Sequence, residues 1–214
     1  MIDELLFPTK NICSFCKDYD DDLELGLCKE CRDRIEELHQ PIKADIENID
    51  KVYVSIYYNR FIKNFIHQFK FNNSSYLYKT FALYMIKTIE IQEIFDYDII
   101  LPVPLHRRKE AIRGYNQSYL LAKEIAKLNN KPISNNVLIK RKWTKEQNKL
   151  NVFERRLNLK SSFFVKNNDM IYNKKILLID DIITTGMTLE YCSKELKENG
   201  ADKIISICLS TPKI

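Results

Sequence analysis

Apolar residues in the C-terminal part of the chain occur first in a continuous run and then at helical spacing. Residues 174–179 predict a strand, 180–186 a polar loop, 187–200 a helix and 202–209 a second strand. A continuous apolar run is typical of a strand that is buried on both faces of a parallel sheet. A strand, a helix and a strand in this order predict a right-handed crossover, and the predicted fold class is therefore α/β.

The same patterns occur earlier in the chain. Residues 60–71 carry one apolar stripe at helical spacing, which we interpret as core packing. The other predicted elements are a strand at 51–58, a helix at 75–92, a buried strand within 97–104, a helix over about 117–129 that Asn116 caps, a short strand at 137–139, and a mobile basic loop at 140–160 that leads into a helix.

Four cysteines near the N-terminus form two CxxC pairs that are separated by eleven residues. Two CxxC turns can bring four thiolates to one metal ion and leave no open coordination position. The pattern therefore predicts a structural zinc site, with an iron–sulfur cluster as the alternative. Residues 28–39 have helical spacing, and Pro41 marks a boundary between a zinc-binding module at 1–42 and a second domain at 43–214. The expected ligands are Cys13, Cys16, Cys28 and Cys31, whereas Cys192 and Cys208 are expected in the core.

The composition argues against a membrane protein. Hydrophobic residues make up 45% of the 214 residues and charged residues 29%, which is typical of a soluble globular protein. No apolar run approaches the roughly 20 residues of a membrane span. The N-terminus also lacks the basic and apolar layout of a signal peptide, and we therefore expect a cytoplasmic location.

The net charge of +5 is the sum of an acidic N-terminal segment and a basic remainder of the chain. Residues 1–50 carry 14 acidic and 6 basic side chains, a net charge of −8, whereas residues 101–160 carry 15 basic and 4 acidic ones, a net charge of +11. Such a concentration of positive charge predicts a surface for a polyanion, either a diphosphate, a nucleic acid or both. A solvated basic surface is the alternative.

The most specific pattern is the segment ILLIDDIITTGMT at 176–188. Ligands of open α/β sheets bind at the carboxyl ends of the strands, and here that end carries Asp180 and Asp181. Two carboxylates can accept hydrogen bonds from a vicinal diol or hold a hydrated Mg²⁺. The turn that follows leads into a helix, whose first backbone N–H groups favour an anion. Thr184, Thr185 and Thr188 add hydroxyl donors, and Gly186 lets the backbone approach a phosphate closely.

This segment resembles the signature of type I phosphoribosyltransferases, the enzymes that bind phosphoribosyl diphosphate (PRPP). The signature is an apolar strand, two acidic residues and a Thr-Thr-Gly-x-Thr turn. The resemblance implies a Rossmann-like, parallel-sheet phosphoribosyltransferase domain in which Asp180 and Asp181 face the ribose hydroxyls and Mg²⁺. It also implies that the 5′-phosphate of PRPP is cradled by residues 184–188, which are Thr184, Thr185, Gly186, Met187 and Thr188.

Three further segments narrow the resemblance to the ComF family. They are PVPLHRR at 102–108, RGYNQS at 113–118, and the pattern R-x-x-T-x-x-Q-x-x-L that begins at Arg141. Members of that family join a CxxC…CxxC module to a phosphoribosyltransferase-like domain. Membership implies a link to natural transformation, in which single-stranded DNA enters the cytoplasm.

Two functions are compatible with the sequence. In the first, a nucleophile displaces diphosphate from PRPP, and Mg²⁺ and loop cations stabilise the charge on the leaving group. The candidate catalytic residues are Arg107, Arg108 and Arg141, with His106 as a further candidate base. In the second, the domain binds PRPP without turning it over and acts as an adaptor for single-stranded DNA or for a protein of the DNA-uptake machinery. The aromatic residues expected to stack on bases are Tyr115, Tyr119, Trp143 and Phe153.

Overall fold

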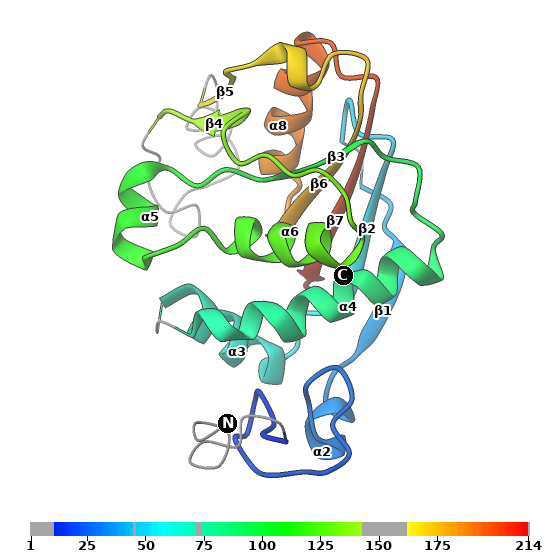
Figure 1. Ribbon diagram of the computed structural model, residues 1–214, viewed down its shortest axis with the longest axis vertical. Helices are drawn as coiled ribbons and strands as arrows, with labels where there is room; N and C mark the ends of the chain where they lie inside the picture. The colour runs from blue at the N-terminus through cyan, green and yellow to red at the C-terminus, as the bar shows by residue number, and fades with distance from the viewer. Residues whose placement is uncertain (1–10, 45, 72–73, 143–161, 214) are drawn as a thin grey trace.

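The computed structural model describes residues 11–44, 46–71, 74–142 and 162–213. Its centre is a five-stranded sheet in the order β1-β2-β7-β6-β3 (Figure 1). The pairs β2·β7, β7·β6 and β6·β3 are parallel, and only the edge strand β1 is antiparallel to its neighbour. The strands are β1 (Glu37–Pro41), β2 (Lys51–Tyr57), β3 (Ile99–Pro102), β6 (Lys175–Ile182) and β7 (Lys203–Thr211).

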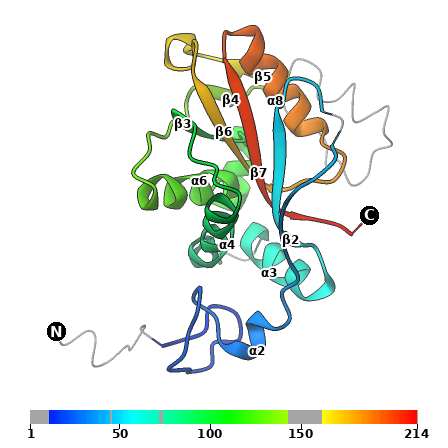
Figure 2. The same cartoon turned by 90° about the vertical axis from the view of Figure 1, so that its right-hand side faces the viewer.

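Helices cover both faces of this sheet, as Figure 2 shows. The side chains of Leu177 and Ile179 pack with the helices on one face, whereas Ile176 and Leu178 pack with α8 on the other. This alternation of side chains is the expected geometry of a strand buried on both faces, and it confirms the predicted α/β class. The covering helices are α3 (Arg60–Phe71), α4 (Tyr78–Ile91) and α6 (Gln117–Leu128) on the first face, with the short helix η1 (Ser75–Leu77) before α4, and α8 (Met187–Glu198) on the second.

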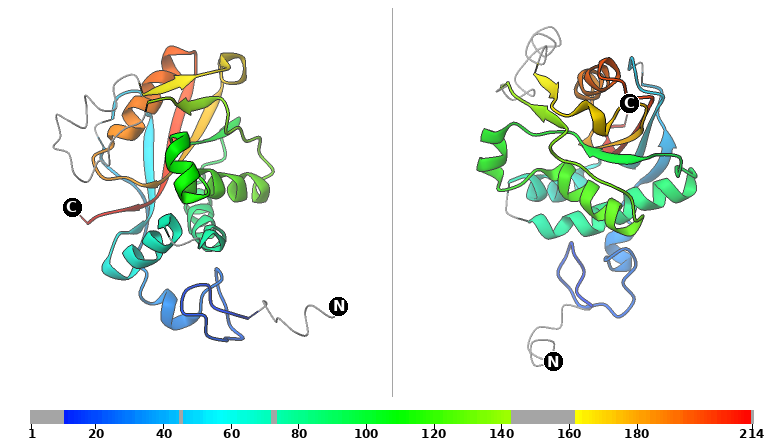
Figure 3. Two further views of the ribbon diagram at one scale, coloured as in Figure 1. Left: turned by 90° about the vertical axis from the view of Figure 1, so that its left-hand side faces the viewer. Right: turned by 45° about the horizontal axis from the view of Figure 1, so that its top comes forward.

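A small antiparallel sheet lies beside α8, and the views in Figure 3 show it next to that helix. It consists of β4 (Leu138–Lys140) and β5 (Phe163–Val165). The backbone N–H of Val165 donates a 3.3 Å hydrogen bond to the Glu195 carboxylate of α8, which attaches the pair to that helix. Most of the segment predicted as a mobile basic loop, residues 143–160, lies outside the described residues. The described residues also form the short helices α5 (Arg107–Arg113) and η3 (Asn168–Met170).

The helix predicted over residues 28–39 is wrong beyond its first turn. Helix α2 spans only Lys29–Arg32, and the chain then enters β1, which pairs with β2. The backbone pairing of β1 with β2 outweighs the helical spacing of the apolar residues in this segment. A polar edge strand needs no apolar face of its own when its backbone is paired, and Pro41 is tolerated at such an edge. The strand precedes residue 42 and still belongs to the main sheet.

The cysteine module packs directly beneath α3 and α4 (Figure 1). Its residue Phe15 stacks on Phe65 of α3 with a centroid separation of 3.8 Å and meets Phe81 of α4 edge-on at 5.8 Å. Cys13 and Leu27 belong to the same hydrophobic cluster. The module therefore shares its core with the helices instead of forming a separate one.

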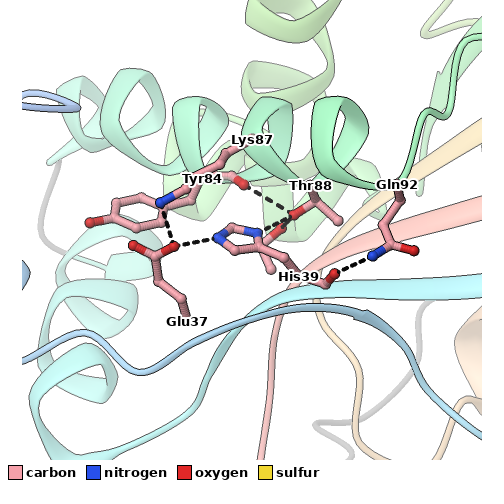
Figure 4. A network of polar contacts seen from close by, with 7 residues as sticks. Glu37, His39, Tyr84, Lys87, Thr88 and Gln92 are labelled. Carbon is pink, nitrogen blue, oxygen red and sulfur yellow. Dashed lines mark hydrogen bonds and ion pairs between the residues drawn. The ribbon is translucent and has the colours of Figure 1, made fainter.

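A polar network ties β1 to α4 (Figure 4). Atom Nε2 of His39 lies 2.6 Å from the Glu37 carboxylate, and Nδ1 lies 2.8 Å from the Thr88 hydroxyl. Lys87 donates to the same carboxylate at 2.6 Å, and Gln92 donates to the His39 carbonyl at 2.8 Å. Because His39 is buried, its imidazole pKa lies below the ordinary value. These bonds hold a polar strand against an otherwise apolar helix.

Candidate functional site

The acidic pair lies within β6 and not in the loop that the sequence predicted. The strand continues to Ile182, because Asp180 is in register with Cys208 of β7 and Ile182 with Ser210. Neighbouring side chains of a strand point to opposite faces. The two carboxylates therefore have separate surroundings at the carboxyl end of the sheet, where ligands of such sheets bind.

Asp180 is almost fully buried, with 8% of its surface exposed. Its Oδ1 atom accepts hydrogen bonds from the Ser118 hydroxyl at 3.0 Å and from the Asp181 backbone N–H at 2.9 Å. Burial, together with the neighbouring Asp181 charge, raises the pKa of the Asp180 carboxyl to about 7. A bound cation or a hydroxyl donor would favour its charged form.

Asp181 forms an ion pair that the sequence did not predict. The Lys70 ammonium at the end of α3 lies 2.8 Å from Asp181 Oδ2. The phenol of Tyr58 is close enough that its pKa is raised, first by burial and second by the Asp181 charge. Lys70 and Tyr58 are far from the motif in the sequence, and a local pattern gives no signal of either contact.

A short turn connects the end of β6 at Ile182 to the start of α8 at Met187. Gly186 adopts φ of 74° immediately before α8, a backbone conformation that favours glycine. A Cβ atom there would lie 2.6 Å from Ile46 Cδ1, so the turn also has no room for a side chain. Thr184 and Thr185 are exposed. The turn encloses a small hollow of about 40 Å³ that is lined by Asp180 and residues 182–189.

The basic residues gather around a larger pocket of about 710 Å³. Arg107 and Arg108 begin α5, Lys140 ends β4, and Arg141 follows that strand; all four residues line the pocket. The Arg141 guanidinium lies over the Phe164 ring at 3.7 Å. The structure thus brings the three predicted catalytic arginines to one pocket. The whole lining is Pro102, Pro104, Leu105, His106, Arg107, Arg108, Glu110, Asn116, Tyr119, Asn135, Asn136, Leu138, Ile139, Lys140, Arg141 and Lys166.

The start of α6 connects the pocket to the acidic pair. Asn116 lines the pocket and caps the helix by accepting from the Ser118 backbone N–H at 3.0 Å, while the Ser118 hydroxyl binds Asp180. Lys140 is on the pocket wall near Asp180, and burial lowers its ammonium pKa to about 8. An anion in the pocket and a ligand at Asp180 would therefore be neighbours.

His106 has a structural role at this pocket. Its Nδ1 atom accepts a 3.2 Å hydrogen bond from the Arg108 backbone N–H and caps α5. Its Nε2 atom lies 3.1 Å from the Arg141 carbonyl across the pocket mouth. Both ring nitrogens thus contact the backbone, which argues against the imidazole as a general base.

Two residues of the predicted aromatic platform, Tyr115 and Tyr119, lie among the described residues. Tyr115 packs 5.8 Å from the Phe69 ring, and its hydroxyl donates a 2.6 Å hydrogen bond to the Phe69 carbonyl, so it belongs to the core. Tyr119 lines the basic pocket. Trp143 and Phe153 lie outside the described residues.

The four cysteines of the N-terminal module converge as predicted. The sulfur atoms of Cys13, Cys16, Cys28 and Cys31 all lie within 4.8 Å of one another, and those of Cys16 and Cys28 are 3.7 Å apart. Sulfur atoms at about 2.3 Å from a tetrahedral zinc ion are about 3.8 Å apart, so the cluster fits that ion.

The thiols of the cluster differ in how readily they ionise. Burial raises the pKa of the Cys13 thiol, but backbone hydrogen bonds, first from Cys28 and then from Cys16 and Phe15, outweigh burial and bring this pKa down to about 7. Burial and the neighbouring thiols raise the pKa of Cys16 to about 12 and that of Cys31 further. A bound metal ion would supply the positive charge that several thiolates need.

The fold and this site define a phosphoribosyltransferase-like protein, and the family model for the phosphoribosyl transferase domain matches residues 118–213. Competence protein F of Haemophilus influenzae is 32% identical over 72% of this chain and 70% of its own length. The chain belongs to the ComF family. Competence protein ComFC of Bacillus subtilis is 30% identical over 71% of this chain and 60% of its own length.

A further sequence relative and a solved structure carry different names. The DNA utilization protein YhgH of Escherichia coli O157:H7 is 28% identical over 67% of this chain and 64% of its own length. The purine phosphoribosyltransferase of Pyrococcus horikoshii Ot3 superimposes with a TM-score of 0.40 at 16% identity, over 59% of this chain and 69% of its own. Among the described residues, no helix is both long and apolar enough to cross a membrane.

Proposed function

We propose that this protein binds PRPP together with Mg²⁺ at the carboxyl end of β6. The observation that carries the proposal is the acidic pair, of which Asp180 is buried, followed by the Gly186 turn at the start of α8. A helix N-terminus and an unhindered backbone favour a phosphate. Two carboxylates beside it favour a diol or a hydrated divalent cation.

The same arrangement suggests how PRPP would lie. Its 5′-phosphate would occupy the turn at residues 184–188, and its ribose hydroxyls would donate to Asp180 and Asp181. Its diphosphate would point toward the pocket that Arg107, Arg108 and Arg141 line. Arginine binds such groups by charge-assisted, bidentate hydrogen bonds. Bound Mg²⁺ would neutralise charge on the diphosphate.

Transfer of the phosphoribosyl group is one outcome of such binding. A nucleophile would form a bond to the anomeric carbon while the bond to diphosphate breaks, and the diphosphate would leave with the electron pair. The pocket arginines would stabilise the leaving group. His106 is the predicted candidate base for this transfer. Both of its ring nitrogens contact the backbone, which favours a structural role instead.

The contacts of His106 support a second function, in which PRPP is bound but not consumed. The relatives' names, competence protein and DNA utilization protein, point to the uptake or use of DNA. In this reading the cytoplasmic protein binds single-stranded DNA through its basic pocket, or binds a protein of the uptake machinery. PRPP would then set the shape or affinity of the adaptor.

The cysteine cluster would hold one structural zinc ion. Four thiolates leave no open position for a substrate, which excludes a Lewis-acid role at that site. The ion would fix the loop that carries Phe15, whose ring packs on α3 and α4.

The two functions are distinguished by incubating the full-length protein with PRPP and Mg²⁺ and assaying diphosphate release with and without candidate bases or amines. Release that depends on an acceptor, and that falls in an Arg107→Ala variant, would establish transfer. Tight PRPP binding without release would favour the adaptor. Absence of PRPP binding would rule out both.

A further inference from the structure

Lys70 already places a positive charge beside one carboxylate of the acidic pair. Its ammonium lies 2.8 Å from Asp181 Oδ2, and the two side chains are 19% and 13% exposed. An ion pair so far withdrawn from water is screened less than a surface pair. The contact therefore counts in the electrostatics of the site.

Two sets of contacts made by neighbouring residues of α3 fix the backbone position of Lys70. Phe69, the residue before it, is fully buried, and its carbonyl accepts hydrogen bonds from Tyr115 at 2.6 Å and Gln117 at 3.4 Å. One turn earlier, Phe65 stacks on Phe15 of the cysteine module. The backbone at Lys70 is thus anchored to α6 and to the module.

We propose that Lys70 is an internal counter-ion that occupies the cation position beside Asp181, so that it competes with a divalent cation for this carboxylate. The proposal rests on the proposed function, because that function assigns Asp181 to Mg²⁺ and ribose. A second cation near Lys70 meets charge repulsion. Free Mg²⁺ therefore binds weakly, whereas Mg²⁺ that arrives with a diphosphate brings the negative charge that offsets the repulsion.

This mechanism makes Lys70 a residue that determines specificity. It keeps the acidic pair from filling with a bare metal ion and reserves it for a ligand that carries phosphate. A merely structural ion pair would behave differently, because its loss would lower stability and leave metal affinity unchanged or reduced.

The test uses Mn²⁺ as the probe, titrated by calorimetry into full-length, zinc-loaded protein without PRPP. Lys70→Met should bind Mn²⁺ at least about tenfold more tightly than the unmodified chain. Lys70→Arg keeps the charge and should bind it as weakly as the unmodified chain. Lys63→Met, on an exposed position of the same helix, is the matched control and should change nothing.

A further substitution tests whether the added Mn²⁺ affinity depends on Asp181. Asp181→Asn in the Lys70→Met background should remove the added affinity. Unchanged or weaker Mn²⁺ binding in Lys70→Met would overturn the proposal. If that variant fails to fold, judged from its thermal transition, Lys70→Gln replaces it under the same expectations.

A parallel titration with PRPP separates this inference from the proposed function. If PRPP fails to bind while Lys70→Met still gains Mn²⁺ affinity, the proposed function fails and the role of Lys70 stands. If PRPP binds and the Mn²⁺ affinity of Lys70→Met does not rise, the proposed function stands and the role of Lys70 fails.

Discussion

The hydroxyl of Ser118 donates a 3.0 Å hydrogen bond to Asp180 and thereby joins the start of α6 to the carboxyl end of β6. Among the described residues, Asp180 accepts hydrogen bonds from the Ser118 hydroxyl and from the Asp181 backbone N–H. Two hydrogen bonds do not offset the cost of burying the charge, and the pKa of this carboxyl is raised to about 7.

The raised pKa of Asp180 predicts a pH dependence of stability. Its ordinary value is 3.8 and its folded value about 7, so the folded state holds this proton more tightly. The stabilisation is complete below the ordinary value and is lost as the pH rises through about 7. Asp180→Asn cannot ionise and should melt a few degrees above the unmodified chain at about pH 8, and by a clearly smaller margin at about pH 5, where less of the stabilisation has been lost. Differential scanning calorimetry at both pH values checks this, and an equal shift at both would contradict it.

Binding of PRPP with Mg²⁺ should raise the melting temperature, because a ligand that binds only the native state stabilises it. The double change Asp180→Asn and Asp181→Asn should abolish this shift, since the carboxylates accept the ribose hydroxyls. Asp169→Asn, on an exposed position of η3, is the control and should retain it. A full shift in the double variant would disprove the assignment of the acidic pair.

Gly186→Val should fail in the same assay for a steric reason. A Cβ atom at this position would lie 2.6 Å from Ile46 Cδ1, and the φ of 74° disfavours a β-branched side chain. We expect a loss of about 1–3 kcal/mol of stability as well as loss of the PRPP-induced shift. Thermal melting with and without PRPP measures both effects, and a variant that still responds to PRPP would show that the turn does not contact phosphate.

Zinc content is the readout for the cysteine cluster. The purified protein should contain about one zinc ion per chain. Cys13→Ser should lower the metal content, and it should also lower the melting temperature of the whole chain because Phe15 and Cys13 share a hydrophobic cluster with α3 and α4. Cys208→Ser, in the buried β7, should leave the metal content unchanged. Elemental analysis that finds neither zinc nor iron would refute the metal site.

Single-stranded DNA should bind weakly and without sequence preference, with an affinity that falls steeply as salt is added. The paired change Arg141→Glu and Lys142→Glu, at exposed positions beside the pocket, should reduce the binding. Lys123→Glu with Lys127→Glu alters the charge equally on the exposed side of α6 and serves as the control. Fluorescence anisotropy of a labelled oligonucleotide measures this. No binding at low ionic strength would leave a protein partner as the route to DNA uptake.

Most of the fold could be predicted from local pattern. The apolar stripe of residues 60–71 coincides with α3, and the Asn116 cap marks the start of α6. The end of β6 could not be predicted in this way. Its apolar run stops at Ile179, but backbone pairing with β7 continues through Asp180 to Ile182 and does not depend on side-chain polarity.

The site could be predicted where it is continuous in the sequence. The Gly186 turn and the four cysteines have strict spacing, whereas the pairing of Lys70 with Asp181 joins residues from two distant elements. Tyr115 illustrates the reverse case. An aromatic ring among basic residues suggested a stacking surface, but the fold places its hydroxyl on the Phe69 carbonyl.

Helix α5 carries Arg107 and Arg108, and none of its residues is buried. It is held at its ends, by the His106 cap and by Gly114 at φ of 82°. Substitutions at the exposed positions of α5 therefore cost little folding free energy, because exposed positions away from caps and cores tolerate substitution. Helix α5 is thus open to evolutionary change and to engineering. A different anion preference can arise there without compensating substitutions elsewhere in the chain.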